Sequence, residues 1–158
     1  MSRVSAAVGV DDVPATTLAL TPVANPGYAD EFTLDLPGAA SATAEAWARA
    51  MFGDTPDAAE RFIFRTLLRL RLAPGPSRDT VAGFVITDRA PESIRLMAHS
   101  PLLTTHLVIQ VSVDGASLAT VMDYHRRRGR VTWTVVSLVH RRLAPGLLRE
   151  AARTVLGQ

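Results

Sequence analysis

Residues 125–153 read HRRRGRVTWTVVSLVHRRLAPGLLREAAR, and the conformation of this stretch decides the fold. Thr, Val and Trp dominate its first part, Arg130–Val139, and their intrinsic propensity favours a β-strand. Apolar residues also recur there at the spacing of one helix face, at Val131, Val135, Leu138 and Leu143. The last part, Leu147–Leu156, predicts a helix on either interpretation, after an interruption at Pro145-Gly146.

Upstream of this stretch, four segments of alternating apolar residues predict an antiparallel meander. They are Val81–Asp88, Ser93–Ser100, Leu103–Val113 and Ser117–His125. Turn-forming residues separate the segments, and Asp114-Gly115 is the strongest hairpin signal in the chain.

The part before the meander predicts one strand and two helices. Phe32, Leu34 and Leu36 alternate with polar residues, which predicts a half-buried strand that starts at Asp30. A first helix ends at Phe52 and has Ser41 or Thr43 as its N-cap. A second helix starts at the N-cap Thr55 and ends at the Pro/Gly-rich residues 73–76.

Composition predicts one folded domain. The chain has 158 residues, of which 47% are hydrophobic and 20% charged, and a chain of this size buries one sizeable core. Residues 1–27 contain small side chains, three prolines and Gly27, so we expect a flexible N-terminal tail there. Within this tail, pairing of Leu18–Leu20 as an edge strand is an alternative. The domain then covers residues 28–158. With no cysteine and no apolar run of about 18 residues, the sequence predicts a cytoplasmic protein without a membrane span.

All 17 basic residues are arginines, and against 15 acidic residues they leave a net charge of only +2. This small excess does not indicate a nucleic-acid partner, which requires cations gathered on one face. The arginines are concentrated only at Arg126–Arg130, here called the arginine cluster, and at Arg141-Arg142. We interpret the arginine cluster as a solvated connection in which Gly129 permits a tight turn, and a clamp for phosphate or carboxylate is the alternative.

Several short motifs also share a characteristic order. HLVIQVSV at 106–113 is followed by Thr120, His125, Arg127, Gly129 and Arg130, and then by His140-Arg141 and Leu147-Leu148-Arg149. Upstream lie AEAWARAMF at 44–52 and Leu-Arg-Leu-Arg at 68–71. In this order the sequence resembles a bacterial family of unknown function, numbered 2867, over roughly residues 30–157. Val108 and Gln110 stand where that family has Asp and Arg, which indicates a more apolar interior here if this strand face points inward.

The resemblance implies an α+β helix-grip fold, similar to the START, Bet v 1 and polyketide cyclase proteins. In that fold a curved antiparallel sheet wraps around a long C-terminal helix, and two short helices follow the first strand. The resemblance also implies that residues 130–156 form one helix, kinked at Pro145, against the local propensity. A cavity is expected between the sheet and this helix.

The candidate site residues follow from side-chain chemistry and from the motifs. His106, His125 and Tyr124 are the candidate acid/base residues, since imidazole titrates near neutrality. Candidates for ligand contact are Thr120, Met122, Gln110, Trp133 and His140. Thr120, Met122 and Tyr124 share one strand face, which suits a cavity wall. A purely structural role is the alternative for each of these residues.

The leading hypothesis is therefore a protein that binds a small apolar or polyketide-like molecule in an internal hydrophobic cavity. A cofactor-independent cyclase or isomerase is the alternative, and an interaction module based on the arginine cluster is the third. No metal or cofactor is expected, because neither paired metal ligands nor a glycine-rich phosphate loop occurs. A homodimer is one option for its assembly.

Overall fold

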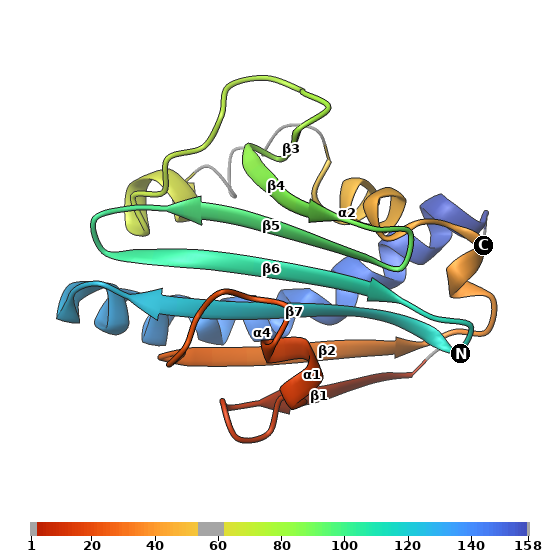
Figure 1. Cartoon of the computed structure of the whole chain (residues 1–158), viewed down its shortest axis with the longest axis horizontal. Coiled ribbons are helices and arrows are strands. Elements are labelled where there is room, and N and C mark those ends of the chain that lie inside the picture. The colour runs from red at the N-terminus through yellow and green to blue at the C-terminus, as the bar shows by residue number, and fades with distance from the viewer. Residues whose placement is uncertain (1–2, 54–61, 158) are drawn as a thin grey trace.

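The computed structural model describes residues 3–53 and 62–157 (Figure 1). In chain order its elements are β1 (Val4–Val8), α1 (Ala15–Leu18), β2 (Tyr28–Asp35), η1 (Ala39–Ser41), α2 (Ala44–Phe52), η2 (Phe62–Leu67), β3 (Thr80–Val81), β4 (Phe84–Arg89), β5 (Ser93–His99), β6 (Leu103–Val111), β7 (Gly115–Tyr124) and α4 (Arg127–Leu156). The fold is α+β, with a curved antiparallel sheet and a long C-terminal helix. The alternating segments predict the antiparallel sheet, and the family resemblance implies its curvature and the long helix.

The strands form one seven-stranded sheet in the order β1-β2-β7-β6-β5-β4-β3, and all the neighbours pair antiparallel. The strands from β4 to β7 form the predicted meander, but the prediction of one strand over Val81–Asp88 is wrong, because Ala82 and Gly83 adopt positive φ and turn the chain between β3 and β4. The predicted hairpin joins β6 to β7, and its turn is closed by the amide of Ser112, which donates to the carbonyl of Gly115. Because β2 pairs with β7, the first predicted strand lies beside the last one.

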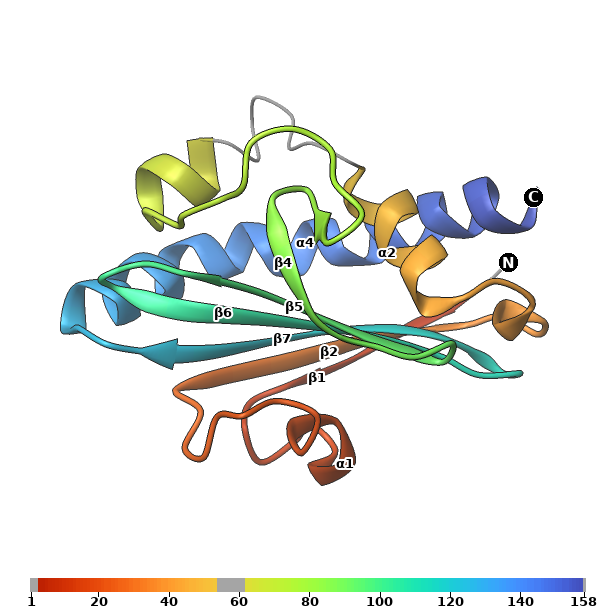
Figure 2. The same cartoon turned by 45° about the horizontal axis from the view of Figure 1, so that its top comes forward.

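The sheet separates two layers (Figure 2). One face, here called the helix face, is covered by α4, α2 and η2, and the other face carries α1. The main core lies on the helix face, and its fully buried side chains include Leu34, Trp47, Ile109, Leu118 and Leu148. A small second cluster, made of Val13, Ala29 and Val121, lies on the α1 face.

The ambiguous stretch is helical. It belongs to α4, which starts three residues before the predicted Arg130, ends at the predicted Leu156 and continues through Pro145. One side of the helix is buried along its length, at Trp133, Val136, Ala144, Leu148 and Ala151. Burial of this face against the sheet outweighs the strand propensity of its Val and Thr residues.

The interpretation of Gly129 as a tight-turn residue is wrong. Gly129 is buried in the first turn of α4, and it is not among the glycines with positive φ. A Cβ atom on Gly129 would lie 2.4 Å from the carbonyl oxygen of Leu102. Glycine is therefore required here because the helix approaches the β5–β6 turn closely.

The N-terminal residues form regular structure where the sequence predicts a flexible tail. β1 pairs with β2 from Val4 opposite Leu34 to Val8 opposite Asp30. Leu18 ends helix α1 and is not part of an edge strand. The side chain of Thr17 in α1 accepts a hydrogen bond from Gln110 of β6. The segment is ordered by this pairing and by the apolar surface that it covers on the α1 face, which its composition does not reveal.

The two predicted helices after the first strand have different outcomes. The first is confirmed as α2, whose N-cap Thr43 accepts a hydrogen bond from the amide of Ala46 at 3.1 Å. The predicted start of the second, at Thr55 and Pro56, lies outside the described residues. Residues 62–67, within the predicted second helix, form the π-helical η2. The predicted end at residues 73–76 is wrong, because residues 68–73 are not helical and Arg69 has a positive φ of 55°, which a helix does not accommodate.

Candidate site between the sheet and the C-terminal helix

The predicted site residues are divided between the two faces of the sheet. Five lie on the helix face or on α4, namely Thr120, Met122, Tyr124, Trp133 and His140. Gln110 points to the opposite face, where it binds Thr17 of α1. His106 pairs with Val121 of the α1-face cluster, so it also points away from α4. His125 is exposed beyond the end of β7.

A buried carboxylate brings two of the helix-face residues, Thr120 and His140, into one cluster. Asp30 of β2 is fully buried, and its Oδ2 atom lies 3.1 Å from Nε2 of His140 on α4. The same imidazole nitrogen lies 3.3 Å from the hydroxyl of Thr120, which is directly opposite Asp30 on β7. A buried carboxylate requires such partners, because an unpaired charge in the interior is very costly.

Tyr28 and Arg141 extend this cluster towards solvent. The hydroxyl of Tyr28 donates to Oδ2 of Asp30, and Nε of Arg141 donates to the Tyr28 oxygen at 3.2 Å. The Arg141 guanidinium also lies over the Tyr28 ring, 5.4 Å from its centroid. Burial, and next the charge of Asp30, raise the pKa of Tyr28 above its usual range, so this phenol remains a neutral donor.

Trp133 completes what we call the Asp30 cluster, formed by Tyr28, Asp30, Thr120, Trp133, His140 and Arg141. The Trp133 ring lies 5.4 Å from the rings of both Tyr28 and His140. Within residues 3–53 and 62–157, two buried atoms of the cluster have no hydrogen-bond partner: Oδ1 of Asp30, an acceptor, and Nε1 of Trp133, a donor. Buried polar atoms are rarely left in this state without a water molecule or a ligand.

The Asp30 cluster is suited to acid/base chemistry as well as to binding. An ionised carboxylate only accepts hydrogen bonds, so Asp30 favours the tautomer of His140 that carries its proton on Nε2. In that tautomer Nδ1 has a lone pair, and Nδ1 has no hydrogen bond to any described residue. The side chain of His140 is 18% exposed, which leaves it within reach of a bound molecule.

Met122 and Tyr124 lie on the helix face beyond the Asp30 cluster. The Met122 sulfur accepts a hydrogen bond from Thr105 at 3.2 Å. Tyr124 lies under the guanidinium of Arg130, 4.9 Å from its ring centroid. Burial raises the pKa of the Tyr124 phenol, which makes it a poor proton donor to a base at neutral pH. These contacts give both residues structural partners.

The two other candidate acid/base residues have no place in the Asp30 cluster. His106 is 5% exposed and its Nδ1 has no partner in the described part of the chain. Burial, and next the charge of Arg95, lower the pKa of His106, so this ring is neutral near pH 7. His125 binds the hydroxyl of Thr104 at 2.7 Å through Nε2, on the neighbouring strand.

Sequence reasoning did not select Asp30 or Tyr28, although the signal was present. Asp30 is in phase with Phe32 and Leu34, the apolar residues that mark the buried face of β2. A carboxylate at an inward position of an amphipathic strand indicates a buried charge, and a buried charge indicates a partner on the element that covers the strand.

A groove of about 400 Å³ lies beside the first turns of α4. We call it the α4 groove, and its lining residues are Thr66, Leu67, Arg69, Leu102, Arg127, Arg128, Val131 and Thr132. A neighbouring hollow of about 540 Å³ has four of these lining residues in common and adds Pro101 and Arg126; the common residues are Arg69, Leu102, Arg127 and Arg128. The arginine cluster therefore lines a concave surface between α4, η2 and the β5–β6 turn.

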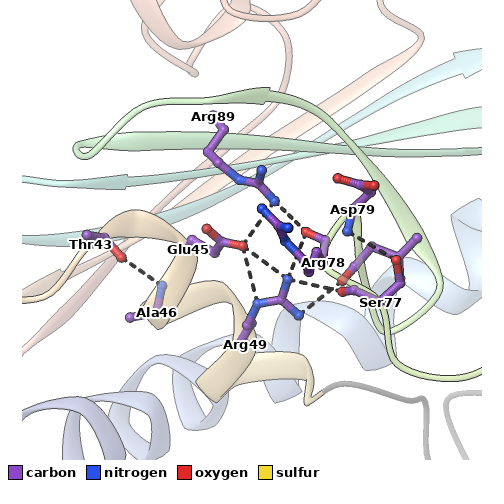
Figure 3. Close-up of polar contacts among 9 residues, drawn as sticks. Thr43, Glu45, Ala46, Arg49, Ser77, Arg78, Asp79 and Arg89 are labelled. Carbon is purple, nitrogen blue, oxygen red and sulfur yellow. Dashed lines mark hydrogen bonds and ion pairs between the residues drawn. The ribbon is translucent and has the colours of Figure 1, made fainter.

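A third polar region joins α2 to the loop before β3 (Figure 3). Glu45 pairs with Arg49 at 3.0 Å and with Arg89 at 3.2 Å. The Arg49 guanidinium also donates to the carbonyls of Ser77, Arg78 and Thr80, at 3.1 to 3.3 Å. Because these donors are occupied by backbone carbonyls, the cluster fastens the loop to α2, and we assign it a structural role.

Among the described residues, no group of three or more His, Asp or Glu side chains is placed to hold a metal ion. Residues 3–53 and 62–157 also contain no helix with both the length and the apolar character needed to cross a membrane. Comparisons with protein-family models, with curated proteins and with solved structures gave no match.

Proposed function

We propose that this chain is a helix-grip protein that binds a small molecule between its sheet and α4, with the Asp30 cluster as the polar anchor. The curved antiparallel sheet and the 30-residue C-terminal helix are compatible with that fold. The ligand has an apolar body and one polar end that can both donate and accept hydrogen bonds. A polyketide-like molecule with a hydroxyl or enol group has this character.

The observation that carries the proposal is a pair of buried atoms, Oδ1 of Asp30 and Nε1 of Trp133, that have no hydrogen-bond partner among the described residues. Each would cost on the order of 1–3 kcal/mol if it stayed without a hydrogen bond. They lie on opposite sides of the interface, on β2 and α4, and both residues flank Tyr28 and His140. A ligand hydroxyl would donate to Asp30 and accept from Trp133.

A ligand screen with variants that each remove one anchoring group tests this proposal. A library of small apolar hydroxyl compounds is screened by thermal shift, and hits are measured by calorimetry on wild type, Asp30→Asn and Trp133→Phe. We expect hits whose affinity falls about tenfold or more in either variant, because one anchoring hydrogen bond is lost. His125→Gln is the matched control, since His125 lies outside the cluster, and it keeps wild-type affinity.

Circular dichroism of the variants separates loss of binding from loss of folding. Hits that bind both folded variants as tightly as wild type would exclude the Asp30 cluster as the anchor. If native mass spectrometry and the ligand screen both find no ligand, the proposed binding function itself would be excluded.

A cofactor-independent cyclase or isomerase is a second candidate, and the Asp30–His140 contact at 3.1 Å favours it. A carboxylate that orients an imidazole is a common arrangement for a general base. In the same assay series, hits are followed for chemical conversion. Catalysis would be supported if wild type converts a hit and His140→Gln abolishes the conversion while its affinity stays within threefold of wild type. Equal conversion by the variant would exclude His140 as the base.

A further inference from the structure

The outward face of α4 carries an apolar stripe that the proposed ligand site does not use. Five large aliphatic side chains are between 49% and 64% exposed, at Val131, Val135, Leu138, Val139 and Leu143. They span about 18 Å of helix, and they face away from the buried side of α4 that contains Trp133 and Leu148. Single exposed aliphatic residues are ordinary, but an aligned row on one helix marks an interaction surface.

Positive charge surrounds this stripe. α4 contains seven arginines and one acidic residue, Glu150. Arg127 and Arg128 precede the stripe, while Arg142 lies within it and Arg149 follows it, and all four are exposed. Arg69 and Arg126 add charge from the adjacent hollow.

The stripe also continues into a recess. Val131 lines the α4 groove together with Leu67 and Thr66 of η2, which lies beside the N-terminal half of α4 (Figure 2). A flat bilayer surface cannot follow such a concave wall, whereas a peptide helix can lie along α4 and fill it. The groove therefore favours a protein segment over a membrane surface.

We propose that the outward face of α4 docks an acidic amphipathic helix of another protein. Its apolar residues pack on Val135 and Leu138, and its Asp or Glu residues pair with the arginines at both ends of the stripe. A second copy of this chain fits less well. In an antiparallel pairing of two α4 helices centred near Leu138, Arg128 of one copy would face Arg149 of the other, and like charges at such short range are unfavourable.

Fluorescence anisotropy with two synthetic helical peptides tests this surface. Both peptides have about 18 residues, long enough to hold a helix, and the same leucine stripe, but their flanking residues are Glu in one and Lys in the other. We expect the Glu peptide to bind with micromolar affinity that weakens as salt rises, and the Lys peptide to bind at least about tenfold more weakly.

Two substitutions on exposed positions then locate the site. Leu138→Ser and Arg128→Glu are each expected to weaken binding of the Glu peptide by about tenfold. The control variant is Arg3→Glu, which makes the same charge change at an exposed residue outside α4 and is expected to leave binding unchanged. A carboxylate in the first turn of a helix is stabilising, so Arg128→Glu does not act by unfolding α4.

Three results would overturn the proposal. Equal binding of the two peptides, or binding that neither Leu138→Ser nor Arg128→Glu weakens, would exclude this face. Binding to phosphatidylglycerol vesicles but not to the Glu peptide would assign it to a membrane surface. A dimer in sedimentation equilibrium that Leu138→Ser dissociates would assign it to a second copy.

Discussion

At the scale of single residues, the helix face and the α1 face of the sheet each bury a titratable group, and the two groups differ in their partners. Asp30 on the helix face contacts Tyr28 and His140. His106 on the α1 face is buried with one ring nitrogen unpartnered in the described part of the chain. The helix face therefore has the better-developed polar site, although the sequence predicts His106 as a candidate for catalysis.

The buried state of His106 predicts a pH-dependent stability. Burial, with the nearby charge of Arg95, lowers the pKa of His106 from its ordinary value of 6.5, and Asp123 acts in the opposite direction. Below pH 6.5 the unfolded chain therefore binds a proton at this residue that the folded chain binds only at lower pH. The contribution to folding is fully present above pH 6.5 and is lost as the pH falls below it.

Urea unfolding at pH 8, 6 and 5 measures this effect. The unfolding free energy of wild type, relative to that of His106→Gln, is expected to decrease as the pH is lowered from 8 to 5. Parallel pH profiles of the two proteins would show that His106 does not titrate differently in the folded and unfolded states.

At the scale of elements, α4 combines three different faces in one helix. Its buried side packs on the sheet, its side next to β2 presents His140 and Arg141 to Asp30 and Tyr28, and its outward side carries the apolar stripe. The helix is positioned at its start by Gly129, which touches the carbonyl of Leu102 in the β5–β6 turn.

Two glycines of α4 provide a matched pair of substitutions. Gly129→Ala places a Cβ atom 2.4 Å from a backbone oxygen, so the helix start must shift, and we expect a loss of about 1–3 kcal/mol in unfolding free energy. Gly146→Ala meets no atom within 4 Å and gains helix propensity, so we expect a gain of about 0.5–1 kcal/mol. Chemical denaturation measures both, and a stabilising Gly129→Ala would contradict the close approach.

At the scale of the whole molecule, the sheet is covered on both faces. α4 and α2 bury the main core, while the N-terminal segment covers Ala29 and Val121 on the opposite face (Figure 2). Hydrogen bonds hold this segment from two strands: Gln110 donates to Thr17, and Arg95 donates to the carbonyl of Leu20. The molecule is thus a three-layer arrangement at its centre.

Removal of residues 1–26 tests this arrangement. The deletion takes away β1 and α1, exposes the backbone edge of β2 and uncovers Val121 and His106. We expect a loss of about 2 kcal/mol or more, which corresponds to a fall in Tm of about 5 °C or more for a chain of this size. A truncated protein with unchanged Tm would mean that the segment behaves as the flexible tail that its composition suggests.

The sequence by itself determined the four strands β4 to β7 of the meander, the strand that contains Asp30, the α2 helix with Ser41 or Thr43 as its cap, and the helical end of the chain. These follow from local rules: period-two alternation, turn residues and capping, which act between near neighbours. It also placed Thr120, Met122 and Tyr124 on one strand face, because side chains two residues apart in a strand point to the same side of the sheet.

Only the tertiary structure decided the conformation of residues 130–139, the order of residues 4–18 and the composition of the Asp30 cluster. Strand and helix propensities nearly balance in Arg130–Val139, so burial of Trp133 and Val136 against the sheet selects the helix. Asp30 joins β2 to Thr120 of β7 and to His140 of α4, which lie 90 and 110 residues further along the chain. Such pairings depend on the register of the sheet and on the rotation of the helix, neither of which is encoded in a short stretch of sequence.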